Sequence, residues 1–87
     1  MTDSAGADNN SKLWEKLIAV LDDKLQFGLL ERVRRAAQYK FEGDTLIIAP
    51  GSKEDSAYLR KESVHQQLSL FAEQSTKVKK VLIRDEQ

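Results

Sequence analysis

Apolar residues recur at three- and four-residue spacing over the first part of the chain, and charged residues lie between them. The apolar positions are Leu13, Trp14, Leu17, Ile18, Leu21 and Leu25. This spacing predicts an amphipathic helix with one apolar face, and Ser11 is a suitable N-cap for it. A break is expected over residues 25–28. A second, shorter helix should follow, with Leu29, Leu30, Val33 and Ala37 facing inward and Glu31, Arg32, Arg34 and Arg35 facing outward.

From Tyr39 the apolar pattern changes to an alternation with period two, which is typical of a strand. Tyr39 and Phe41 point one way, and the charged residues next to them point the other way. Turn-forming residues at 42–44 separate this run from the β-rich run over residues 45–49, so together the two runs predict a hairpin. Because the second run is apolar on both faces, we expect it to be central in a sheet that helices cover on at least one side.

The next segment predicts a helical crossover and a last strand. Ser52, with Asp55 three residues later, resembles a capping box. Helical spacing then continues to about residue 74 with a slip between Leu59 and Val64, which fits either one kinked helix or two helices with Ser63 as the second cap. The β-branched run over residues 78–83 predicts a final strand, and a right-handed crossover would place it parallel to a hairpin strand.

This order of elements predicts a small α+β domain with a sheet of about three strands packed against helices. Residues 1–11 have no large apolar residue after Met1, so they are predicted to form a disordered arm. Residues 12–84 form the predicted single domain, and residues 85–87 a polar tail. The residues on the apolar phase of each element should form one continuous core: Leu17, Leu21, Leu46, Ile48, Leu68, Phe71 and Val81.

Composition argues against catalysis. The chain has no cysteine and a single histidine, His65, so disulfides and thiolate metal sites are excluded and no paired histidines exist. Gly51-Ser52-Lys53 precedes a predicted helix but lacks the glycine spacing of a phosphate-binding loop. We therefore expect no enzymatic activity, no metal and no cofactor. A secreted domain this small would often need disulfides, so the absence of cysteine favours the cytoplasm. No apolar run approaches membrane-spanning length and the acidic N-terminus is unlike a signal peptide, so no membrane contact is expected.

The 14 basic and 14 acidic residues cancel overall, but basic residues cluster locally. Residues 32–41 contain four basic residues and no acid, and three lysines lie over 77–80. The functional interpretation is a basic face for an acidic protein or for DNA; the alternative is a solvated helix face with lysines protecting an edge strand. Trp14 is either a core residue beneath the sheet or a partly exposed interface anchor. The candidate partner-binding residues are therefore Arg32, Arg34, Arg35, Lys40, Lys79 and Trp14.

Several segments together resemble a known group of domains. They are Leu13-Trp14-Glu15-Lys16, Leu29-Leu30-Glu31, Phe41-Glu42-Gly43-Asp44-Thr45-Leu46-Ile47-Ile48 and the final basic-hydrophobic strand. Over residues 13–83 the chain resembles the small C-terminal domain of the gamma/tau subunit of bacterial DNA polymerase III, part of the replicative clamp loader. The N-terminal domain of the replication initiator DnaA shares the Leu-Trp opening and the hairpin, but its typical second-helix tryptophan and nearby proline are missing here.

This resemblance implies a KH-like α+β fold and a protein-interaction role in bacterial DNA replication. The implied partner is a replisome protein, such as a polymerase or helicase subunit, with weak DNA binding and homo-oligomerisation as further expectations. The alternative function is a KH-like module that binds single-stranded nucleic acid through its basic segments and through Tyr39 and Tyr58. Two observations disfavour this alternative: the GxxG clamp of KH domains is missing, and the net charge is zero.

Overall fold

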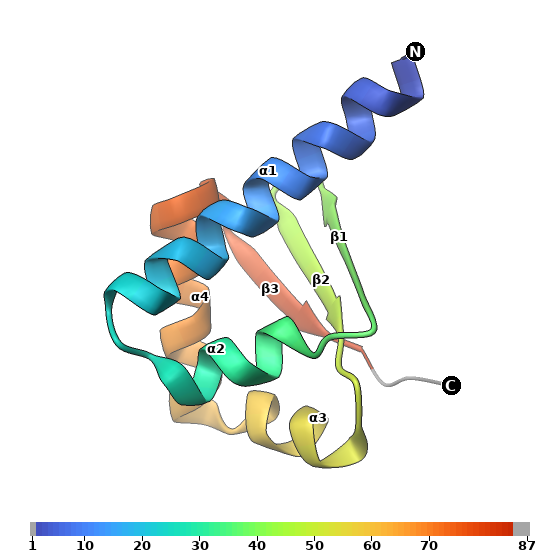
Figure 1. Ribbon diagram of the computed structural model, residues 1–87. Coiled ribbons are helices and arrows are strands. Elements are labelled where there is room, and N and C mark those ends of the chain that lie inside the picture. The colour runs from blue at the N-terminus through green and yellow to red at the C-terminus, as the bar shows by residue number, and fades with distance from the viewer. Residues whose placement is uncertain (1, 85–87) are drawn as a thin grey trace.

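The computed structural model describes residues 2–84, with side-chain surroundings from residue 11 onward. Over this range the chain forms four helices and a three-stranded sheet, in the order α-α-β-β-α-α-β (Figure 1). The elements are α1 (Thr2–Asp23), α2 (Phe27–Arg34), β1 (Gln38–Glu42), β2 (Thr45–Ala49), α3 (Lys53–Arg60), α4 (Glu62–Thr76) and β3 (Lys80–Ile83). The predicted α+β class is confirmed, and the crossover consists of two helices. The predicted tail over 85–87 lies outside the described residues.

The sheet has the strand order β1-β2-β3, so β2 is central as its apolar pattern predicts. β1 and β2 form an antiparallel hairpin closed by a two-residue turn, in which Gly43 has a φ of 60°. β2 and β3 pair in parallel, with Thr45 opposite Lys80 and Ile48 opposite Ile83. This pairing is the one that a helical crossover between the two strands predicts.

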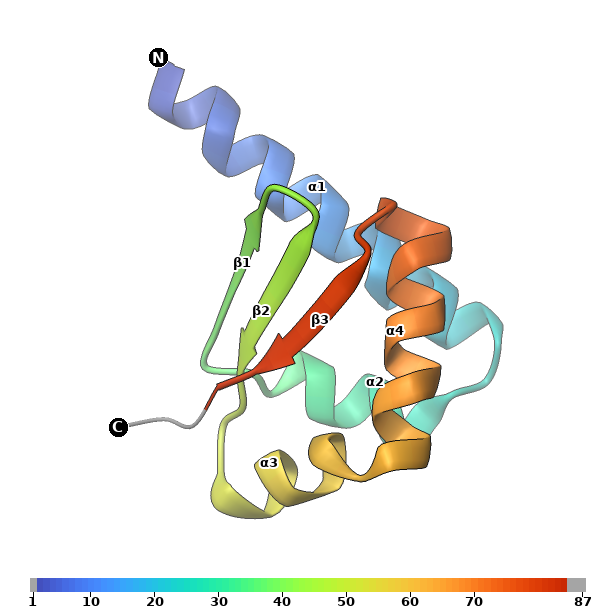
Figure 2. The same cartoon turned by 180° about the vertical axis from the view of Figure 1, so that it is seen from behind.

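The helices lie on one face of the sheet, and the opposite face has no helix in front of it (Figure 2). The core forms between that covered face and the helices. Leu46, Ile48 and Val81 contribute from the strands and are almost fully buried. The helices contribute Leu17, Leu21, Leu29, Leu30, Val33, Leu59, Leu68 and Ala72. The residues predicted for the core are therefore buried, apart from Phe71.

Phe71 is only half-buried and packs at the margin of the core. Leu68 and Ala72, which are four residues apart on α4, take the inward positions and leave Phe71 beside them. A prediction from spacing alone treats the whole apolar stripe as equal, although one side of the stripe faces the core more directly. Ala37, predicted to face inward, is exposed because α2 ends three residues before it.

Two helix starts differ from the prediction. α1 begins at Thr2 and continues through Ser11, so a helix occupies the segment predicted to be a disordered arm, and its first turns project beyond the sheet (Figure 1). The segment contains no proline that would interrupt the helix. The break in the crossover lies at Lys61 rather than at Ser63. The cap at Ser52 is confirmed, because its Oγ accepts a hydrogen bond from the backbone N–H of Asp55 at 3.1 Å.

None of the described helices combines the length and apolar character needed to cross a membrane.

Candidate interaction surface

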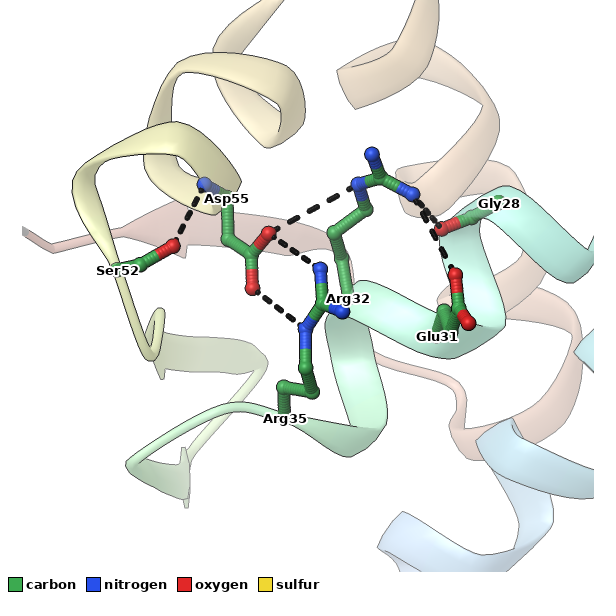
Figure 3. Close-up of polar contacts among 6 residues, drawn as sticks. All are labelled: Gly28, Glu31, Arg32, Arg35, Ser52 and Asp55. Atoms are coloured by element: carbon green, nitrogen blue, oxygen red, sulfur yellow. Dashed lines mark hydrogen bonds and ion pairs between the residues drawn. The ribbon is translucent and has the colours of Figure 1, made fainter.

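A buried carboxylate joins α2 to α3. Asp55 lies in the first turn of α3 and is only 3% exposed. Arg35, the residue just after α2, donates two hydrogen bonds to it, from Nε to Oδ2 at 3.1 Å and from Nη2 to Oδ1 at 2.8 Å (Figure 3). This two-pronged geometry is the strong form of an arginine–carboxylate pair. The contact fixes the end of α2 against the start of α3.

Arg32 lies near the same carboxylate and approaches the Oδ1 that also accepts from Arg35. Its Nε is 3.8 Å from Asp55 Oδ1 (Figure 3). Its guanidinium carbon lies 4.1 Å from the centre of the Tyr58 ring. Its Nη1 also reaches the carbonyl oxygen of Gly28 at 3.4 Å. Arg32 thus contacts both helices and stacks on an aromatic ring, as guanidinium groups favour.

These contacts set the charge state of the cluster. The hydrogen bond from the Arg35 side chain, together with the positive charges of Arg35 and Arg32, lowers the pKa of Asp55 below its ordinary value, although burial opposes this effect. The same hydrogen bond raises the pKa of Arg35. The carboxylate is therefore ionised at neutral pH, and the cluster is a charged contact within the domain.

The predicted basic residues do not form one continuous face. Arg32 and Arg35 contact Asp55, whereas Arg34 is exposed on α2. Lys40 projects from β1, with its Nζ 3.5 Å from Glu42 Oε2. Lys79 lies at the hairpin end of the sheet, where its backbone N–H donates to the carbonyl oxygen of Asp44 at 2.6 Å. α2 ends at the opposite end of the strands (Figure 1). The arginine segment and Lys79 are thus separated by the length of the sheet.

Trp14 is half-buried and stacks on Tyr39 of β1. The ring centres are 4.1 Å apart and the rings are almost parallel, at 1°. Tyr39 also contacts the edge of Phe41, with ring centres 6.3 Å apart. This arrangement favours the interpretation of Trp14 as a packing residue between α1 and the sheet. The ring of Tyr39 therefore packs on Trp14, and the ring of Tyr58 packs against Arg32. Both tyrosines considered as stacking platforms for bases thus contact other side chains of the domain.

Leu25, in the turn between α1 and α2, and Phe27, the first residue of α2, form the turn patch. Their side chains are 69% and 55% exposed. Leu25 has a φ of 58° and ends α1 in a Schellman motif, because its N–H donates to Asp22 O and the N–H of Gln26 donates to Leu21 O. Glycine normally occupies this position, and a left-handed conformation costs another residue about 1–2 kcal/mol.

A shallow hollow of about 300 Å³ adjoins the turn patch. It is lined by Phe27, Gly28, Leu30, Glu31 and Arg34. An apolar floor with one acidic and one basic residue at its rim suits an apolar side chain from another protein. The sequence pattern predicts the break at residues 25–28 but not this surface. The feature of the sequence that could have indicated this surface is Leu25, a leucine inside a predicted helix break where glycine would be expected.

Candidate catalytic chemistry is sparse in the described part of the chain. No group of three or more histidine, cysteine or acidic residues is placed to hold a metal ion between residues 2 and 84. His65 lies on α4 with its Nε2 2.8 Å from the carbonyl oxygen of Val81. Because a carbonyl oxygen only accepts, the Nε2 of His65 carries the proton in this contact. The imidazole is therefore bonded to the sheet.

Comparison of the chain with protein-family models, with curated proteins and with solved structures finds no match.

Proposed function

We propose that this chain is a non-catalytic protein-interaction module of the bacterial replication machinery, similar to the C-terminal domain of the gamma/tau subunit or to the N-terminal domain of DnaA. The turn patch is the proposed contact surface. The observation that carries the proposal is Leu25, which is strained in the left-handed region and exposed at the same time.

Neither property of Leu25 benefits the isolated domain. Its backbone conformation is unfavourable for a branched side chain, and most of its apolar surface stays in water. Strained residues and exposed apolar patches are both enriched at binding sites, where a partner covers the apolar surface. Phe27 and the hollow beside it extend the same surface, and aromatic side chains often anchor interfaces.

The proposed class of partner rests on the sequence resemblance. The structure has the α+β class that the resemblance implies. We therefore propose a polymerase or helicase subunit as the partner. The contacts of Tyr39 with Trp14 and of Tyr58 with Arg32 disfavour single-stranded nucleic acid as the main ligand, because such ligands usually stack on free aromatic rings.

The experiment separates binding from folding by means of Leu25→Gly. Glycine is the preferred residue at this helix end, so the change should relieve about 1–2 kcal/mol of backbone strain. It should lose about 0.5–1 kcal/mol of stabilisation from the partly buried leucine side chain, so the free energy of unfolding should stay the same or rise. The melting temperature should be unchanged or higher. Affinity for purified polymerase or helicase subunits, measured by calorimetry, should nevertheless fall by at least tenfold.

Leu70→Ala is the matched control, because Leu70 is 52% exposed on α4 and lies outside the turn patch. This variant should bind every partner as the wild-type domain does. Binding by Leu25→Gly at wild-type affinity to each subunit that the domain binds would reject the turn patch as the contact surface. Tighter binding of oligo-dT than of any subunit would favour the nucleic-acid alternative instead.

A further inference from the structure

The face of the sheet turned away from the helices carries a second distinctive surface, which we call the outer sheet face. The strand register places its residues in cross-strand rows. Lys40, Ile47 and Leu82 form the middle row, and Glu42, Thr45 and Lys80 form the row at the hairpin end. At the other end Gln38 pairs with Ala49, and Arg84 lines the same shallow hollow as Ala49 and Lys40.

No helix lies over this face among residues 2–84 (Figure 2). Two of the three residues in its middle row are nevertheless aliphatic, because Ile47 and Leu82 lie side by side on β2 and β3. Leu82 is 44% exposed. The solvated face of a sheet normally carries polar residues. An aliphatic pair at the centre of such a face indicates a surface that another molecule covers.

The charges around this aliphatic pair are mostly positive. The described residues of the outer sheet face include the cations Lys40, Lys80 and Arg84 and a single acid, Glu42. That acid lies 3.5 Å from the Nζ of Lys40 and offsets its charge. The outer sheet face therefore presents an apolar centre with a net positive rim, which is complementary to a ligand that is apolar at its centre and acidic around it.

The open edge of β3 is not arranged for strand addition. The carbonyl oxygen of Val81 lies 2.8 Å from His65 Nε2, and the carbonyl oxygen of Ile83 accepts a hydrogen bond from Arg60 Nη2 at 3.0 Å. Side chains from the crossover helices thus occupy the acceptors that an added strand would need. A ligand would therefore bind across the side chains of the face rather than along the backbone of the edge.

We propose that the outer sheet face binds an acidic amphipathic segment of a partner protein, with its apolar residue on Ile47 and Leu82 and its carboxylates near Lys80 and Arg84. This is a second surface, separate from the turn patch and independent of the function proposed above. A second copy of the chain fits less well, because two such faces would bring their positive rims together. Nucleic acid also fits less well, since the face carries no aromatic ring for a base to stack on.

The test uses ¹⁵N-labelled domain and a defined probe, a soluble synthetic peptide in which leucine alternates with glutamate. Titration should shift the backbone amide signals of the outer sheet face, including those of Ile47 and Leu82. Lys80→Glu and Leu82→Thr should each weaken binding at least fivefold. Threonine keeps the β-propensity of that position, and the melting temperature of each variant checks the fold. Lys16→Glu, the same charge change at an exposed site on α1, should bind as the wild type does.

Three comparisons make the outcome decisive. A peptide with lysine in place of each glutamate should not bind, and equal binding of both peptides would overturn the charge argument. Saturable shifts on the same face with oligo-dT but not with the acidic peptide would overturn the proposal in favour of nucleic acid. Self-association of the free domain that Leu82→Thr abolishes would assign the face to a second copy. Leu25→Gly should bind the acidic peptide normally, which keeps this result separate from that of the turn patch.

Discussion

The stacked pair Trp14 and Tyr39 gives the sharpest prediction for stability, because it joins the first helix to the first strand. We expect Trp14→Ala to destabilise the domain, and we expect much of the loss to depend on Tyr39. The appropriate perturbation is therefore a double-mutant cycle of Trp14→Ala, Tyr39→Ala and the combined variant.

The magnitude follows from burial and geometry. Replacing a fully buried tryptophan by alanine costs about 3–5 kcal/mol, and the half-buried Trp14 should lose roughly half of this. The parallel rings at a centre distance of 4.1 Å should contribute a coupling of about 0.5–1.5 kcal/mol beyond area burial. For a domain this small, each 1 kcal/mol shifts the melting temperature by about 4–8 °C. Trp14→Ala should therefore cost about 1.5–2.5 kcal/mol and lower the melting temperature by about 6–20 °C.

The assay is urea unfolding followed by far-UV circular dichroism, since the chain has one tryptophan and its fluorescence would be lost in every variant that lacks Trp14. A parallel cycle of Trp14→Ala with Tyr58→Ala is the control. Tyr58 lies on α3 against Arg32, so these two changes should be additive to within about 0.5 kcal/mol. A coupling between Trp14 and Tyr39 no larger than in this control would refute the packing role and favour Trp14 as an exposed anchor.

Four further variants test other parts of the fold. Gly51→Ala should cost about 1–3 kcal/mol in denaturant melts, because a Cβ there would press on the backbone carbonyl of Arg35. Asp55 has a lowered pKa in the folded state, so its stabilisation is present above about pH 4 and is lost as the pH falls through the folded pKa. The melting temperature of Asp55→Asn should therefore fall less on acidification than that of the wild type. Leu21→Ala should cost about 2–5 kcal/mol and the half-buried Phe71→Ala less, as thermal melts would measure.

The parts of the fold that depend on local periodicity could be predicted from the sequence. Leu17 and Leu21 lie inward because helical spacing places them on the same face of α1. Leu46 and Ile48 lie inward because side chains alternate along a strand, which places both on the same face of β2. The hairpin turn at Gly43 and the cap at Ser52 were also predictable, since turn and cap chemistry involve near neighbours. The parallel position of the last strand followed from the handedness and length of the crossover.

The parts that depend on contacts between distant residues were not predictable. Arg35 was predicted to face outward and Asp55 to belong to a helix cap, and only the packing of α2 against α3 brings them together. Ser11 has the chemistry of a cap, but α1 continues through it because capping preference does not stop a helix. Lys79 belongs to the same set of candidate partner-binding residues as the arginines, but strand direction places it at the hairpin end of the sheet.

The position of β3 has a consequence for how the domain forms. β2 is the central strand, yet its second neighbour comes from the last segment of the described chain, after both crossover helices. Until that segment is available, β2 has one open edge, and Leu46 and Ile48 lack the cover that Val81 and its neighbours provide. Long-range parallel pairing of this kind forms slowly, because the loop must close before the contact is gained. During synthesis on the ribosome, the hairpin and the helices can form as they emerge, but cooperative folding must wait for the strand that contains Val81.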